Sequence, residues 1–296
     1  MGALRKAVGY CGACAVHRVA LGYWIASRDP RWSHGSRRCA VCSVETPCVG
    51  CDHSRCHRSC GAGSLEGVQL TVAEEPEDVD PNNLLEIAYS VETPDDSRNL
   101  YRRWASTYDE DFIDATGYVY HDNVVAAFLD AGGAAGGAIA DVGCGTGVVG
   151  VALADLGVDN VDGLDISPEM LKVAGTKRSV HGTPAYRNLV EVDLTVGVPI
   201  EDDAYNGIIS TGVFTHGHLG PSALGEIIRI AAPTALCAIG INEHFYEEHR
   251  FDAWFAKAAR NGLINVPELI SVRIYDELDG EHGGTRAAVA LFTVMA

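Results

Sequence analysis

The sequence predicts an α/β protein built on a doubly wound, mostly parallel sheet of seven strands that ends in an antiparallel hairpin. Two observations predict this architecture. From residue 138 onward, short apolar segments of strand type alternate with segments whose apolar residues recur at helical spacing, as in a sheet covered by helices. Residues 270–296 instead contain two strand-like segments around a glycine-bearing turn, the pattern of a hairpin.

The N-terminal part of the chain differs from the rest in its charge. Residues 1–65 contain nine Arg and Lys against three Asp and Glu, whereas residues 66–296 contain 13 against 37. An acidic body lacks the clustered Lys and Arg that bind phosphates, so nucleic acid is not expected as a partner. No apolar run reaches about 18 residues, so a membrane span is not expected either.

Cysteines are also concentrated at the N-terminus, where eight of the ten precede residue 61. The pairs CGAC, CAVC and CVGC, followed by CHRSC, are of the kind that grips tetrahedral zinc. One spacing predicts a zinc site with four ligands: Cys39, Cys42, Cys56 and Cys60. The alternative is that residues 1–60 form a leader without a defined fold. Cys144 and Cys237 are expected to be reduced, which fits a cytoplasmic location, and an organellar address in the leader stays open.

An acidic linker over residues 61–81, GAGS followed by AEEPEDVDP, separates this leader from the domain expected at 82–296. The domain begins with two predicted helices, over 82–91 and 93–112. The second one places an apolar, aromatic stripe on one face: Leu100, Tyr101, Trp104, Ala105 and Tyr108. Asp109 and Asp111 are expected to cap or solvate the end of this helix.

The following elements alternate in order along the chain. Strands are predicted at 138–143, 158–167, 189–194, 206–214 and 234–242. Helices are predicted at 118–131, 148–157, 168–178, 221–231 and 249–262. Pro168 stands near the start of its helix, where a missing N–H is harmless.

The stretch AIADVGCGTGVVG, residues 138–150, predicts a ligand held close to bare backbone. A phosphate-binding P-loop is excluded because no lysine follows the glycines. Gly145, Gly147 and Gly150 do satisfy the G-x-G-x-x-G dinucleotide pattern, with Asp165 lying 20 residues further on. An acid, Asp141, ends the strand before the glycines, which is unusual for a dinucleotide site.

DVGCGTG resembles the first motif of the class I S-adenosylmethionine-dependent methyltransferases. GLDISPEML is similar to their second motif, whose acid holds both ribose hydroxyls, and VEVDLT to their third, whose Asp meets the adenine amino group. The resemblance implies a Rossmann-like sheet with S-adenosyl-L-methionine as cofactor. It implies cofactor contacts at Asp141, Gly143, Cys144, Gly145, Gly147, Asp165, Ile166, Met170, Asp193, Leu194 and Thr211.

A narrower resemblance covers residues 82–296. LYRRWASTYDEDF and STGVFTHGHLGP are similar to the methyltransferase-like family of the Williams–Beuren syndrome region and its bacterial counterparts. In that family the aromatic helix implies a lid over the cofactor. Tyr101, Trp104 and Tyr108 then become expected cofactor contacts, since aromatic faces pack on a sulfonium cation.

The acceptor of the methyl group is expected to be a small molecule. The Asn/Asp-Pro-Pro-Tyr motif of amino-methylating enzymes does not follow the fourth strand, where TGVFTHGH stands instead. His216 and His218 in this stretch are the candidates for a catalytic base, with a helix cap as the alternative. Asn242 and His244 are candidates for lining the acceptor pocket.

Two other functions stay open at this point. The domain could bind S-adenosylmethionine as a non-catalytic sensor or adaptor, or, more distantly, act as an NAD-dependent oxidoreductase. The oligomeric state is not indicated by the sequence.

Overall fold

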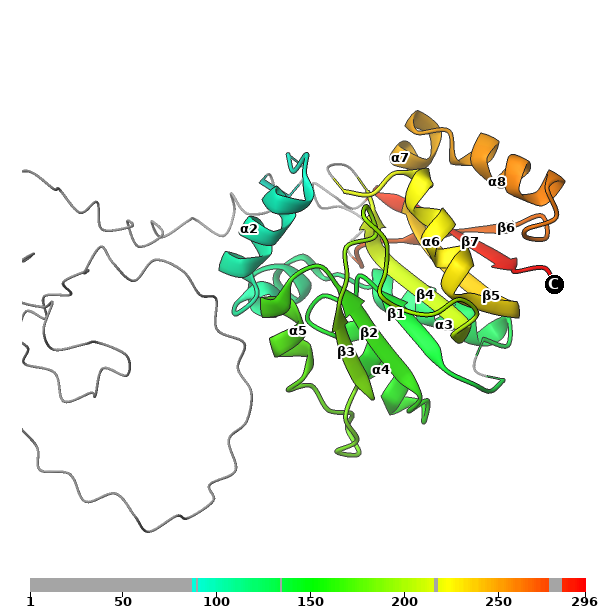
Figure 1. Cartoon of the computed structure of the whole chain (residues 1–296). Helices are drawn as coiled ribbons and strands as arrows, with labels where there is room; N and C mark the ends of the chain where they lie inside the picture. Colours follow the sequence, from blue (N-terminus) through cyan, green and yellow to red (C-terminus); the bar gives the residue numbers. More distant parts are fainter. Residues whose placement is uncertain (1–86, 89, 134, 216–217, 277–283) are drawn as a thin grey trace, which may run out of the picture. The chain divides into compact units, whose positions relative to one another are not determined.

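A seven-stranded sheet in the order β3-β2-β1-β4-β5-β7-β6 organises the protein (Figure 1). It belongs to a computed structural model that describes residues 87–88, 90–133, 135–215, 218–276 and 284–296. The strands are β1 (Ile139–Val142), β2 (Val161–Asp165), β3 (Asn188–Glu191), β4 (Tyr205–Phe214), β5 (Ala231–Asn242), β6 (Glu268–Arg273) and β7 (Arg286–Thr293).

The direction of the strands confirms the predicted fold class. Strands β1 to β5 pair in parallel, and β7 pairs antiparallel with both β5 and β6. The final hairpin therefore inserts β7 between β5 and the edge strand β6. Parallel neighbours need crossover connections, and helices supply these between β1 and β2, between β2 and β3 and between β4 and β5.

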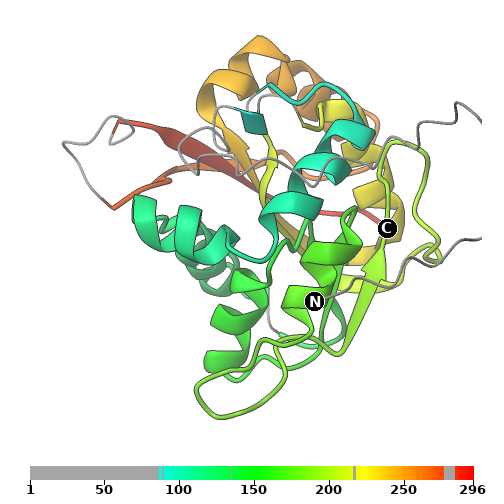
Figure 2. The same ribbon diagram turned by 90° about the vertical axis from the view of Figure 1, so that its left-hand side faces the viewer.

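Helices cover both faces of the sheet (Figures 1 and 2). They are α2 (Pro94–Trp104), α3 (Tyr120–Asp130), α4 (Val148–Asp155), α5 (Pro168–Ala174), α6 (Leu224–Ile230), α7 (Glu243–Glu248) and α8 (Phe251–Arg260). Successive strand residues point to opposite faces, so Ile139 packs with α3 and α4 while Ala140 packs with α6 to α8. None of the helices in the described part of the chain has the length and apolar character needed to cross a bilayer.

Three local features differ from the prediction. Helix α2 ends at Trp104, and a separate π-helix follows at Asp109–Asp114, where one continuous helix over 93–112 was expected. Strand β5 begins at Ala231, and Thr234 within it has a φ of 70°, so the strand is irregular beside Pro233. Asn242 starts an additional short helix, α7, because its Oδ1 accepts hydrogen bonds from two backbone N–H groups.

The order of the strands places a crevice at the carboxyl end of β1. From β1 the chain adds β2 and then β3 on one side, and it then crosses to add β4 on the other side. The loops after β1 and β4 therefore leave the sheet in opposite directions. Ligands of open α/β sheets bind at such a switch point.

Candidate functional site

A cavity of about 230 Å³ lies at the carboxyl ends of β1, β2, β3 and β4. The loops after these strands form its floor, and residues of α2 and of the segment that follows it form its roof. Its lining includes Ser97, Tyr101, Tyr108, Gly143, Cys144, Gly145, Thr146, Asp165, Ile166, Met170, Asp193, Leu194, Thr195, Thr211 and His218. No Lys or Arg is among the described residues that line it.

The loop after β1 exposes its main chain to this cavity. Gly143, Gly145 and Gly147 have φ values of 72°, 52° and 97°, which lie in the left-handed region that favours glycine. At Gly143 a Cβ atom would also overlap the Val213 side chain. Helix α4 starts immediately after Gly147. A ligand in the cavity can therefore approach bare backbone at the start of a helix.

The carboxylate of Asp165, at the end of β2, holds this loop in place. Its Oδ2 accepts a hydrogen bond from the Gly145 N–H at 2.8 Å, and its Oδ1 accepts one from the Ser167 N–H at 2.8 Å. The residue is 8% exposed and lines the cavity. Burial raises the pKa of Asp165 above its ordinary value, although these backbone N–H groups favour the charged form.

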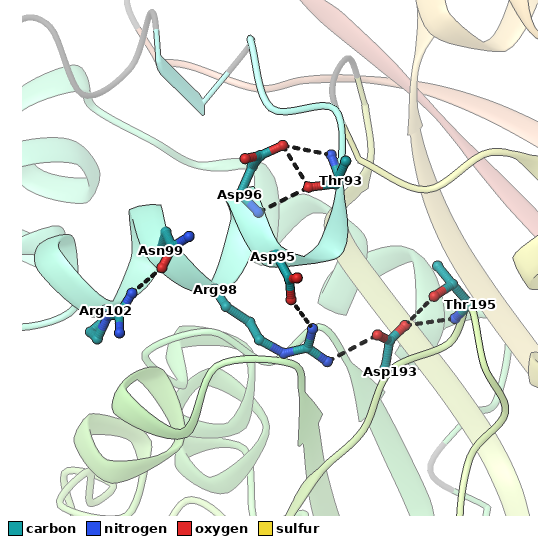
Figure 3. A network of polar contacts seen from close by, with 8 residues as sticks. All are labelled: Thr93, Asp95, Asp96, Arg98, Asn99, Arg102, Asp193 and Thr195. Atoms are coloured by element: carbon teal, nitrogen blue, oxygen red, sulfur yellow. Dashed lines mark hydrogen bonds and ion pairs between the residues drawn. The ribbon is translucent and has the colours of Figure 1, made fainter.

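The carboxylate of Asp193, just after β3, connects the floor of the cavity to helix α2 (Figure 3). Its Oδ2 accepts from Arg98 Nη2 at 2.9 Å, and its Oδ1 accepts from the N–H and the Oγ1 of Thr195. Burial raises the pKa of Asp193, but the hydrogen bonds from Thr195 and Arg98 outweigh this effect and leave the pKa below its ordinary value.

Helix α2 begins with a capping box that sets where Arg98 lies. Thr93 Oγ1 accepts from the Asp96 N–H, and the Asp96 carboxylate accepts in return from the Thr93 N–H. Pro94 follows the cap, where it costs no hydrogen bond. Figure 3 shows Arg98 reaching from this helix to Asp193, whereas Arg102 contacts Asn99 on the same helix.

The carboxylate of Asp109 forms a second connection between the roof and the glycine loop. It accepts from Thr146 Oγ1 at 2.5 Å and pairs with Lys177, which follows α5. The expectation that Asp109 only caps or solvates its helix is therefore wrong for this residue. Asp109 is the first residue of the π-helix, so these contacts hold the start of that helix against the glycine loop.

Asp141 lies inside β1 and is fully buried behind the cavity. Its Oδ2 accepts a hydrogen bond from the Tyr186 hydroxyl at 2.7 Å, and that hydroxyl accepts one from the Gly150 N–H at 3.1 Å. Its Oδ1 has no hydrogen-bond partner among the described residues. Burial, with a smaller contribution from Asp165, raises the pKa of Asp141 to about 7.

A second, smaller cavity of about 70 Å³ adjoins the first. Aromatic residues form most of its wall, and Tyr101, Tyr108, Tyr118, Gly212 and His218 line both cavities. The Tyr101 hydroxyl and His218 Nε2 lie 2.8 Å apart in a hydrogen bond at this boundary. Asn242 lines the second cavity, whereas His244 lines neither.

Most of the residues predicted to bind the cofactor surround the first cavity. Eleven of the fourteen line it, and three do not: Trp104, Asp141 and Gly147. Trp104 lines the second cavity instead. His216 and the four predicted zinc ligands, Cys39, Cys42, Cys56 and Cys60, lie outside the described residues. Within the described part, no group of three or more His, Cys, Asp or Glu side chains is arranged to hold a metal ion.

Several residues of the site were not predicted from the sequence. Arg98 has a usable signal, since it lies three positions before Tyr101 and so shares its helix face. Thr146 lies inside the glycine motif and could have been named with it. Tyr118 and Tyr120 carry no such signal, because Tyr118 is placed by a backbone bridge to the distant Tyr275 and Tyr120 by the packing of α3 on the sheet.

Comparison with known proteins agrees with this geometry. Residues 139–234 match the family described as "Methyltransferase domain". No curated protein matches the chain.

Among solved structures, the chain is similar to one described as "Complex between the Haloferax volcanii Trm112 methyltransferase activator and the putative methyltransferase". The two are 20% identical with a TM-score of 0.51, over 66% of this chain and 98% of that chain. A TehB-like methyltransferase from Corynebacterium glutamicum is 25% identical, with a TM-score of 0.43 over 68% of this chain and 100% of its own. The magnesium protoporphyrin IX methyltransferase of Synechocystis is 22% identical, with a TM-score of 0.40 over 60% of this chain and 78% of that chain.

The raised pKa of Asp141 predicts a pH-dependent stability. Between the unfolded value of 3.8 and the folded value of about 7, the native state binds the extra proton. The free energy of unfolding therefore falls as the pH rises through this window, by at most about 4 kcal/mol from this group.

Asp141→Asn keeps a neutral acceptor for the Tyr186 hydroxyl and removes this dependence on pH. Urea unfolding of both proteins from pH 4 to 8 should show the variant gaining stability relative to the wild type as the pH rises. A difference that is constant with pH contradicts the assignment.

The bridge from Arg98 to Asp193 predicts how firmly helix α2 is held. Arg98→Ala should raise amide hydrogen exchange in α2 roughly fivefold, because a partly exposed charged hydrogen bond contributes about 1 kcal/mol. Arg102→Ala is the matched control, since among the described residues Arg102 hydrogen-bonds to Asn99 of its own helix and not to the sheet. Mass spectrometry of both variants measures the exchange. Equal exchange in the two variants would show that the bridge does not hold the helix.

Proposed function

We propose, from the methyltransferase domain that residues 139–234 match, that the chain transfers the methyl group of S-adenosylmethionine to a small molecule bound in the second, aromatic cavity. The observation that carries the proposal is the grouping of the glycine loop, Asp165 and Asp193 around one cavity without a Lys or Arg among its described lining residues. A cofactor without phosphate needs no such cation. The narrower resemblance to the Williams–Beuren methyltransferase-like family stays a prediction.

The residues of the first cavity fit the parts of S-adenosylmethionine. A carboxylate offers about four acceptor positions, and the N–H groups of Gly145 and Ser167 take one on each oxygen of Asp165, so each oxygen keeps a position for a ribose hydroxyl. Asp193 and Leu194 after β3 would hold the adenine. The backbone of Gly143 to Gly145 would approach the methionine part, whose ammonium group suits an acidic surrounding.

The chain's own contribution to catalysis is alignment and exclusion of water. S-adenosylmethionine, when bound, supplies a methyl group that a nucleophile displaces from the sulfonium. Helix α2 covers the first cavity with Ser97 and Tyr101. His218 lies at the boundary of the two cavities, hydrogen-bonded to Tyr101, where its imidazole can take the proton of an acceptor hydroxyl.

The size and the wall of the second cavity support a small acceptor. A cavity of about 70 Å³ leaves no room for a bulky acceptor, and the described lining is mostly aromatic. The acidic composition of residues 66–296 also disfavours a polyphosphate chain such as a nucleic acid.

Calorimetric titration of the full chain tests the proposal. S-adenosylmethionine and S-adenosylhomocysteine are expected to bind with micromolar Kd, and NAD is expected not to bind. Asp165→Ala should weaken both adenosyl ligands at least about 100-fold, because two hydrogen bonds to a charged group are lost together with the anchor of the loop.

Asp162→Ala is the control for that substitution. Asp162 lies on the same strand and pairs with Arg187, but it does not line the cavity. This variant is expected to keep the Kd of the parent, even with lowered stability. Absence of binding by both adenosyl ligands, or tighter binding of NAD, would contradict the proposed function.

A further inference from the structure

Two buried hydrogen-bonding groups belong to residues in the wall of the second cavity and lack a partner in the part of the chain that the structure describes. Trp104 Nε1 and the Tyr120 hydroxyl find none among the described residues, and the two side chains are 2% and 3% exposed. They come from different elements, α2 and α3, and both line the same cavity. Native proteins pair nearly all such groups, so two in one small cavity indicate that a ligand supplies the partner.

We propose that the second cavity selects a neutral aromatic acceptor with two oxygen substituents, of the dihydric phenol class. This inference rests on the proposed function and specifies its acceptor. One oxygen would accept a hydrogen bond from the Trp104 N–H and bond to the Tyr120 hydroxyl. The second oxygen would lie toward His218, at the boundary with the first cavity, and receive the methyl group.

The Trp104 N–H and the Tyr120 hydroxyl, together called the anchor, favour an oxygen atom on the ligand. The indole N–H of Trp104 donates only, so it requires an acceptor atom on the ligand. The Tyr120 hydroxyl both donates and accepts, and a phenol oxygen with its proton matches both groups. Neither Trp104 nor Tyr120 lines the first cavity. The anchored oxygen is therefore distinct from the one at the boundary.

The neutral character of the acceptor follows from the described lining, which contains no Asp, Glu, Lys or Arg. An anionic acceptor would be buried without a cation to pair with, and burial of an unpaired charge is costly. A cationic acceptor would likewise be buried without a carboxylate of the described lining to pair with. A neutral ligand meets neither penalty.

The aromatic wall favours a planar ring. Tyr118 lies with its ring centroid 5.0 Å from that of Phe112 and 6.0 Å from that of Tyr275. Trp104 meets Tyr108 edge to face at 4.8 Å. Rings at these separations and tilts present both faces and edges, which an inserted aromatic ring can pack against.

Methyl transfer to the acceptor exchanges one bond of the methyl carbon for another. The oxygen beside His218 forms a bond to the methyl carbon while the bond from that carbon to sulfur breaks. S-adenosylhomocysteine leaves as the neutral thioether. The phenol proton passes to the His218 imidazole and from there to solvent.

Four one-ring probes test the charge and the oxygen requirement: resorcinol, toluene, benzoate and benzylammonium. Each is titrated into the full chain saturated with S-adenosylhomocysteine, and the Kd is measured by ligand-observed NMR. Resorcinol is expected to bind at least tenfold more tightly than each of the other three. Tighter binding of benzylammonium or benzoate, equal binding of toluene, or no binding of any probe to the saturated protein would overturn the proposal.

Two variants test the anchor. Tyr120→Phe removes only the hydroxyl, and Trp104→Phe removes the indole N–H. Each should raise the Kd of resorcinol about fivefold and leave that of toluene unchanged. Trp254→Phe on helix α8, which lines neither cavity, is the matched control. Unchanged resorcinol binding in both variants would overturn the anchor.

The titration of S-adenosylhomocysteine itself separates the two levels of the account. If each protein binds it and the probes fail, the acceptor class is wrong while the proposed function stands. If the wild type does not bind it, the proposed function fails and the acceptor class with it.

Discussion

The carboxylate of Asp165 is the contact on which the site depends. Through Gly145 it fixes the loop after β1, and through Ser167 it fixes the start of α5, while its own backbone ends β2. Three segments that the sheet brings together are thus tied by one buried acid. Without these hydrogen bonds the loop, whose glycines have left-handed φ values, would have no fixed position from which to face a ligand.

The roof of the site is attached by charges at two points, and its aromatic residues divide the space beneath. Arg98 connects α2 to Asp193 at the end of β3, and Asp109 connects the π-helix to Thr146 and Lys177. Between these two anchors the aromatic side chains of the same segment lie between the two cavities. Tyr101 and Tyr108 line both. The segment that covers the first cavity therefore also lines the second.

The doubly wound, mostly parallel sheet and its final hairpin could be predicted from periodic apolar segments. Short motifs indicated most of the residues that line the first cavity. Asp165 and Asp193 each stand at a strand end that the pattern locates to within a few residues. The contacts of Asp109 at the start of the π-helix were not predicted, because Thr146 and Lys177 are far away in sequence. Tyr120 was expected only as part of a helix. Its place in the second cavity depends on how α3 packs against β4 and β5.

A crystal structure of the full chain with S-adenosylhomocysteine tests the central claim most directly. The account predicts the ribose hydroxyls within hydrogen-bonding distance of Asp165, the adenine beside Asp193 and Leu194, and the homocysteine part against Gly143 to Gly145. The sulfur should then face His218 and the second cavity. A ligand bound with its sulfur directed away from that cavity, or bound elsewhere on the domain, would contradict the account.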